Sequence, residues 1–166
     1  MRQAVLCQLL LLIYHQTTTL VDLHPFNGAR HYTVGERVTE AGVNAVLMSL
    51  APIGFAFRIH GLMTFGVIYY FVLFVVELII WWVPYMGEPS GRWRSVYNRL
   101  LSLATSNFEP GDTLDHWVAI HTRLHRGTIS FLPARAGRIV PNLEHTLLHV
   151  LTIVTAILTL VAYRQF

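Results

Sequence analysis

The sequence contains no lysine, few charged residues of any kind and a single cysteine. Charged residues make up 13% and hydrophobic residues 54% of the chain, whereas soluble domains average about 25% and 45–50%. One core of 166 residues cannot bury that much apolar surface, so we expect a lipid environment. All 12 basic residues are arginine, and no soluble segment has a basic face, which argues against a nucleic-acid partner. With Cys7 alone, an intrachain disulfide is excluded.

Several motifs with a defined chemistry are also missing. The chain has no P-loop, no dinucleotide fingerprint, no CxxC pair and no nucleophile elbow. It has no c-type haem attachment motif, and its hydroxyl residues show no arrangement of base and acid around a nucleophile. Nucleotide-dependent and serine-hydrolase activities are therefore not indicated.

Four apolar segments are present, and each is long enough to be considered as a membrane span. They cover residues 4–23, 41–57, 62–86 and 143–163. The sequence thus predicts an all-α integral membrane protein with four transmembrane helices, forming a single membrane domain over residues 1–166. The first segment resembles a signal peptide, but no small-x-small cleavage site follows it, so we expect an uncleaved span.

Three local features refine this prediction. Turn residues in 24–40 predict a polar loop, with the second helix beginning at Thr39 or Glu40. Pro52 predicts a kink in that helix. Trp81 and Trp82, near the end of the third segment, are typical of an aromatic belt at the water boundary.

The connection 87–142 is too long for a structureless loop. Its apolar periodicity predicts two amphipathic helices, at about 92–104 and 113–126, lying in the head-group layer. Ordinary packing against the other helices is the alternative. The residues expected to contact membrane lipid head groups are Arg92, Trp93, Arg94, Arg99, Trp117, Arg123 and Arg126.

Arginine distribution predicts the orientation. With four spans, nine arginines fall on the side of the first loop and the 87–142 connection, and three fall on the other. The positive-inside rule then makes the 87–142 connection cytoplasmic and both termini extracytoplasmic. We expect a bacterial-type inner membrane.

Ionisable residues inside the apolar segments are the candidate functional groups, because buried charge in a membrane is costly and marks sites. At ~1.5 Å per residue, His15 and Glu77 lie ~12 Å, and His149 ~9 Å, from the loop-side ends of their segments. His145 shares a helix face with His149. His121 and His125, on the second amphipathic helix, are placed to cover the same region.

The sequence therefore indicates a small polytopic membrane protein with a candidate His/Glu site near the cytoplasmic face. One interpretation is a metal site, with Zn or Fe bound by His15, Glu77, His121, His125, His145 and His149. It would serve a metal-dependent enzyme that acts on a lipid-soluble small molecule. The two HxxxH pairs resemble part of the histidine motifs of membrane desaturases and hydroxylases, whose HxxHH boxes are absent here.

Three other interpretations remain open. His15 and His149 could be axial ligands of a haem. Glu77 and the histidines could form a proton or ion relay in a transporter or channel, as a homo-oligomer because four short spans make a thin pathway. In the broadest interpretation the protein is a structural or lipid-binding scaffold, in which each imidazole bonds to a neighbouring helix.

Overall fold

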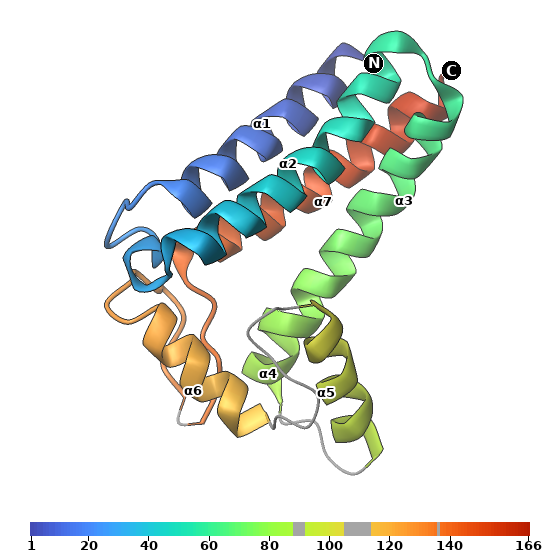
Figure 1. The fold of residues 1–166 in the computed structure, drawn as a ribbon. Helices are drawn as coiled ribbons and strands as arrows, with labels where there is room; N and C mark the ends of the chain where they lie inside the picture. Colours follow the sequence, from blue (N-terminus) through green and yellow to red (C-terminus); the bar gives the residue numbers. More distant parts are fainter. Residues whose placement is uncertain (88–91, 105–113, 136) are drawn as a thin grey trace.

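Four long helices dominate the structure, a computed structural model that describes residues 1–87, 92–104, 114–135 and 137–166 (Figure 1). All regular secondary structure in these ranges is helical, which confirms the predicted all-α class. The long helices are α1 (Arg2–Leu20), α2 (Val34–Phe57), α3 (His60–Glu77) and α7 (Leu143–Arg164).

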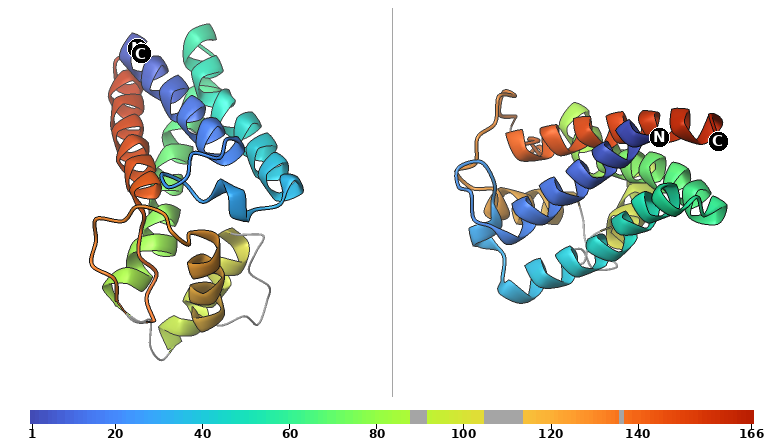
Figure 2. Two further views of the ribbon diagram at one scale, coloured as in Figure 1. Left: turned by 90° about the vertical axis from the view of Figure 1, so that its left-hand side faces the viewer. Right: turned by 90° about the horizontal axis from the view of Figure 1, so that it is seen from above.

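The long helices pack in a ring. α1 contacts α2 and α7, and α3 contacts the same two helices. Both termini lie at one end, and the α1–α2 loop lies at the other end with the segments that follow α3 (Figures 1 and 2). The predicted site residues that lie outside the long helices are therefore all at the end opposite the two termini.

Small and polar residues join the long helices in the interior. A Cβ atom on Gly66 of α3 would lie 2.7 Å from the Cβ of Ala51 of α2, so only glycine permits this close approach. Gln8 of α1 donates a hydrogen bond to Thr159 of α7 across 2.9 Å, and both side chains are fully buried. Close backbone approach and buried side-chain bonds are typical of helices that associate in lipid.

Within the described ranges, three helical stretches are long and apolar enough to cross a membrane. They are Val34–Phe57, His60–Met86 and Leu143–Arg164. α1, which corresponds to the predicted span 4–23, is not among them. Large apolar side chains are exposed on the outer faces, including Val46, Ile68, Val72, Val150 and Ile157, which is consistent with membrane association.

α2 begins at Val34, so the predicted start at Thr39 or Glu40 is wrong. The hydroxyl of Thr33 accepts a hydrogen bond from the backbone N–H of Glu36, and the Glu36 carboxylate accepts one from the N–H of Thr33. This reciprocal capping box fixes the first turn. Gly35, one of the turn residues on which the predicted loop 24–40 was based, lies inside the helix, and α2 continues through Pro52.

The third long stretch changes its helical form near its end. α3 continues into a π-helical turn (η2, Leu78–Trp82) and then into α4 (Val83–Met86). In a π-helical turn successive side chains are less widely separated around the axis than in an α-helix, and such turns are frequent at functional sites. Trp81 is only 8% exposed and packs in the interior, so its predicted place in an aromatic belt is wrong.

Two shorter helices follow within the 87–142 connection. α5 (Arg92–Ala104) covers the first predicted helix, and α6 (Leu114–Leu124) covers most of the second, whose residue 113 lies outside the described ranges. Asp115 of α6 forms an ion pair with Arg94 of α5 at 3.5 Å. The two helices lie beyond the loop end of the long helices (Figure 2).

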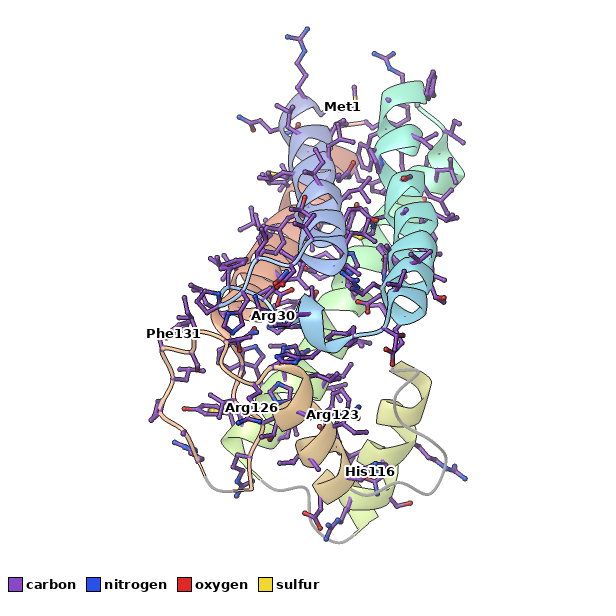
Figure 3. All side chains as sticks on the ribbon, turned by 60° about the vertical axis from the view of Figure 1, so that its left-hand side comes forward. Met1, Arg30, His116, Arg123, Arg126 and Phe131 are labelled. Atoms are coloured by element: carbon purple, nitrogen blue, oxygen red, sulfur yellow. The ribbon has the colours of Figure 1, made fainter. Side chains whose placement is uncertain are left out.

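The residues expected at lipid head groups have different environments. Trp93 is 66% exposed, and Arg123 and Arg126 are exposed on and just after α6 (Figure 3). Trp117 is 6% exposed and packs in a cluster with Trp81 and Tyr97, so the structure places its ring in the interior and not at a lipid-facing surface.

Candidate metal centre

Four imidazoles surround the indole of Trp81 at the loop end of the molecule. His121 and His125 come from the end of α6 and the residue after it, and His145 and His149 come from the first two turns of α7. The centroid of Trp81 lies 3.7 Å from that of His145, 4.7 Å from His121, 5.2 Å from His125 and 6.2 Å from His149. The π-helical turn thus presents Trp81 where α6 and α7 meet.

Two of these histidines and an adjacent glutamate have the spacing of a metal site. One side-chain ligand atom from each of His125, Glu144 and His145 lies within 4.8 Å of the other two. Ligands of a tetrahedral zinc ion with bonds of 2.0–2.1 Å are ~3.3 Å apart. Side-chain shifts of ~1 Å would therefore bring the three atoms onto one ion.

Backbone hydrogen bonds hold the chain between α6 and α7 in place. The N–H of Ile129 donates to the carbonyl of Pro25 at 2.9 Å, and the N–H of Leu143 donates to the carbonyl of Ile129 at 2.8 Å. Gly28, in the α1–α2 loop, approaches α6 so closely that a Cβ there would collide with the carbonyl of Leu124. The α1–α2 loop therefore fixes where α6 ends relative to α7.

The side chain of Asn142 lies between the two histidines of the group. It is 1% exposed and caps α7, because its Oδ1 accepts from the backbone N–H of His145 at 3.0 Å. The same oxygen is 2.7 Å from Nδ1 of His145, and Nδ2 is 3.4 Å from Nδ1 of His125. An outer-shell acceptor orients a metal-binding imidazole by taking the hydrogen of its other ring nitrogen, and the oxygen of Asn142 is placed to do this for His145. Nδ2 is a donor, so it faces the lone pair on Nδ1 of His125, and an ion bound at that nitrogen would replace this contact.

Burial keeps the imidazoles of α6 and its C-terminus neutral. It lowers the pKa of His121 well below the usual value, with a smaller contribution from the nearby His125. Burial also lowers the pKa of His125 to about 4, with a smaller effect of His31. A neutral imidazole keeps the lone pair that a metal ion needs.

His149 and Glu77 lie next to this group but have partners of their own. The indole N–H of Trp82 donates to Nδ1 of His149 at 2.9 Å, so the neutral ring carries its hydrogen on Nε2. Glu77 is 7% exposed, and its Oε1 lies 2.9 Å from the hydroxyl of Thr152. Nε2 of His149 and Oε2 of Glu77 are buried and have no hydrogen-bond partner among the residues that the structure describes.

His15 is held by different residues again. Its Nε2 lies 3.8 Å from a carboxylate oxygen of Glu40 in α2, and its Nδ1 lies 3.5 Å from the hydroxyl of Thr19. His15, Glu77 and His149 were predicted to lie at similar depth in the membrane. The structure gives each of them a separate hydrogen-bonding or ionic partner. The convergent group is built from α7 and the end of α6 instead.

Three residues that shape the site are not among the predicted ligands. Glu144 is an acid in the first turn of a helix, where acids are common because they favour the helix dipole, so it gave no specific signal. Asn142 is recognisable as a helix cap but not as a partner of imidazoles. The position of Trp81 depends on the π-helical turn, for which we know no sequence signal.

No known protein family, curated protein or solved structure matches this chain. The chemistry of the site therefore has to be argued from its donors.

Two imidazoles and one carboxylate suit zinc, and the same set with open positions suits non-haem Fe(II). Structural zinc sites usually have four protein ligands, whereas sites that exchange or activate a ligand keep a position open. In the part of the chain that the structure describes, His125, Glu144 and His145 offer three ligands. The arrangement therefore fits an ion that keeps an open coordination position.

Proposed function

We propose that this protein is a four-span membrane protein that binds one transition-metal ion, Zn²⁺ or Fe²⁺, at the loop end of its long helices. His125, Glu144 and His145 are the ligands. The observation that carries the proposal is the convergence of these three side chains from two separate segments to within 4.8 Å. A bound metal at this position would act as a Lewis acid toward whatever occupies its open position.

The surrounding residues support a metal site over a purely structural role. The buried rings of Trp81, His121 and His149 lie beside the ligands and exclude water from that side of the site. Such buried surroundings have a low dielectric constant, which limits solvent access and strengthens interactions with the ion. The oxygen of Asn142 lies 2.7 Å from Nδ1 of His145 and can orient that ligand, as expected of an outer-shell residue.

We further propose that α1 is a fourth membrane span and that α5 and α6 lie in the head-group layer on the cytoplasmic side. α1 has an apolar middle and packs against two of the three apolar helical stretches. Arg123, Arg126 and Trp93 are exposed, as head-group contacts require. A reporter fused after Phe166 should behave as extracytoplasmic, and a cytoplasmic signal there would refute the orientation.

Metal analysis of the detergent-purified protein tests the metal site. We expect one equivalent of Zn or Fe in the wild type, and loss of that equivalent in His125→Ala, Glu144→Gln and His145→Ala. His60→Ala is the matched control, because His60 lies in a separate contact with Tyr163 of α7. A stable, monodisperse wild-type protein that takes up no Zn²⁺, Fe²⁺ or Co²⁺ would refute the metal site.

A proton relay is the second candidate function, and Glu77 favours it. The single hydroxyl hydrogen of Thr152 faces two acceptors at 2.9 Å, Glu77 and the carbonyl of Leu148. When that hydrogen bonds to Leu148, the bond to Glu77 needs a proton on the carboxyl group. Proton flux in liposomes that is lost in Glu77→Gln would support the relay, and equal flux in both proteins would exclude it.

A further inference from the structure

A small pocket adjoins the metal ligands on the side of the α1–α2 loop. It has a volume of about 40 Å³ and is lined by all three proposed ligands and by Thr18, Arg37 and Glu40. One water-sized sphere needs roughly 10–15 Å³, so the pocket holds a few atoms. It is too small for a lipid-soluble organic molecule and fits a small inorganic or carboxylate ion.

Arg37 is one of the lining residues and has an unsatisfied donor. Its Nη1 donates to the carbonyl of Leu20 at 3.1 Å, which fixes the guanidinium at the end of α1. Its Nε is buried and has no hydrogen-bond partner in the described structure. An unmade hydrogen bond at a buried charged donor is costly, so an acceptor in the pocket would stabilise this arrangement.

The formal charges of the pocket indicate the charge of that acceptor. Arg37 contributes +1, and Glu40 and Glu144 contribute −1 each, so the lining has a formal charge of −1. A divalent metal ion changes the total to +1. One monovalent anion would then neutralise the pocket, and the guanidinium is well suited to hold it because its planar N–H groups match oxyanions.

We propose that the metal-loaded protein binds one small monovalent oxyanion of the carboxylate class, such as formate or bicarbonate, between the metal and Arg37. This inference rests on the proposed metal site and names the class of ligand that occupies its open position. One oxygen of the anion lies on the metal, and another accepts from Nε of Arg37. The hydroxyl of Thr18 is also on the lining and donates to the carbonyl of His15 at 3.3 Å.

Cobalt substitution makes this testable, because Co²⁺ has visible bands that respond to a new ligand. The wild-type protein loaded with one equivalent of Co²⁺ is titrated with sodium formate, and sodium chloride at equal ionic strength is the reference. We expect a saturable spectral change with formate. Arg37→Gln should weaken formate binding by roughly tenfold or more, the cost of one charge-assisted hydrogen bond, and leave Co²⁺ stoichiometry at one.

Two variants serve as comparisons. Arg30→Gln is the matched control, because Arg30 is exposed, pairs with Asp22 at 3.1 Å and is not on the pocket lining. It should titrate like the wild type. Arg37→Lys keeps the charge but lacks Nε and the planar fork, so we expect it to bind formate more weakly than the wild type. It also distinguishes a loss of binding from a loss of fold, provided that its thermal unfolding matches that of the wild type.

The possible failures are distinct. If Co²⁺ binds stoichiometrically and formate leaves the spectrum unchanged, the anion site is refuted and the metal site stands. If Arg37→Gln and the wild type bind formate equally, the assignment to Arg37 is refuted. If the wild type takes up no Co²⁺, the metal site itself fails, and this inference fails with it.

Discussion

The side-chain oxygen of Asn142 accepts from the backbone N–H of His145 and lies 2.7 Å from Nδ1 of the same residue. Because a backbone N–H can only donate, the atom that faces it must be the amide oxygen. An amide oxygen only accepts, so a neutral His145 carries its hydrogen on Nδ1 and its lone pair on Nε2. One residue therefore both starts α7 and sets the tautomer of a proposed ligand.

Asn142→Ala should affect stability and metal binding together. Loss of the cap should lower the free energy of unfolding by about 1 kcal/mol, and loss of the outer-shell contact should weaken Co²⁺ binding by roughly 10–100-fold. Thermal denaturation and Co²⁺ titration measure the two effects.

Thr33→Ala is the matched control for that variant, because it removes the cap of α2 at a similar expected cost. It should leave Co²⁺ affinity unchanged. Asn142→Asp keeps a side-chain acceptor for the helix start and should retain most of the stability. Equal Co²⁺ affinity in Asn142→Ala and the wild type would show that Asn142 is a cap and nothing more.

Gly28→Ala should disturb the site from the α1–α2 loop. The added Cβ would collide with the carbonyl of Leu124 and would lie 3.1 Å from Nδ1 of His125. Forcing α6 away costs about 1–3 kcal/mol, as expected of overpacking, and moves His125 from the other two ligands. We expect a lower melting temperature and weaker Co²⁺ binding.

Gly42→Ala is the comparison, because a Cβ at Gly42 meets nothing within 4 Å and alanine favours a helix. It should be neutral or slightly stabilising. If both alanine variants behave alike, the close approach of Gly28 to α6 does not constrain the site.

Trp81 should report metal binding by fluorescence. The centroid of its ring lies 3.7 Å from that of His145, in a tilted arrangement, and 5.2 Å from that of His125, so a paramagnetic ion on those residues would quench its emission. Trp81→Phe should abolish most of the quenching on addition of Co²⁺, whereas Trp93→Phe, at an exposed position on α5, should not. Equal quenching in Trp81→Phe and Trp93→Phe would place the ion elsewhere.

The helices were predictable because their signals are local, whereas the assembly of the site was not. The HxxxH spacing predicts that His145 shares a face with His149 and that His121 shares one with His125, and the ring centroids of these pairs lie 6.2 and 4.6 Å apart. That the two pairs meet depends on the loop that returns from α6 to α7. Loop geometry of this kind is set by long-range hydrogen bonds, such as that from Ile129 to Pro25.

The errors have physical reasons too. Equal depth in a membrane constrains height but not direction around a helix, so it could not show that His15 faces Glu40 and Glu77 faces Thr152. The start of α2 is readable in the sequence, since Thr33 and Glu36 have the spacing of a capping box, but Gly35 between them is typical of a turn and obscures this signal.

The buried histidines at the end of α6 should make the metal-free protein sensitive to acid. Burial lowers the pKa of His125 to about 4 in the folded state, against 6.5 when exposed. Between these values the unfolded chain binds more protons than the folded one, so stability rises with pH in this interval and is lost as the pH falls from 6.5 toward 4. Above 6.5 the residue adds no pH dependence.

The size of this effect follows from the two pKa values. Each such histidine contributes at most ~1.4 kcal/mol per pH unit, or about 1 kcal/mol for His125 between pH 7 and 5.5. We expect chemical denaturation with a chelator present to show this loss in the wild type. His125→Gln should reduce the loss, and a His121→Gln, His125→Gln double variant should reduce it further, because burial lowers the pKa of His121 as well. Identical pH profiles in all three proteins would mean that these rings are accessible to protons in the folded state. That result would contradict the exclusion of water by the buried rings beside the proposed metal ligands.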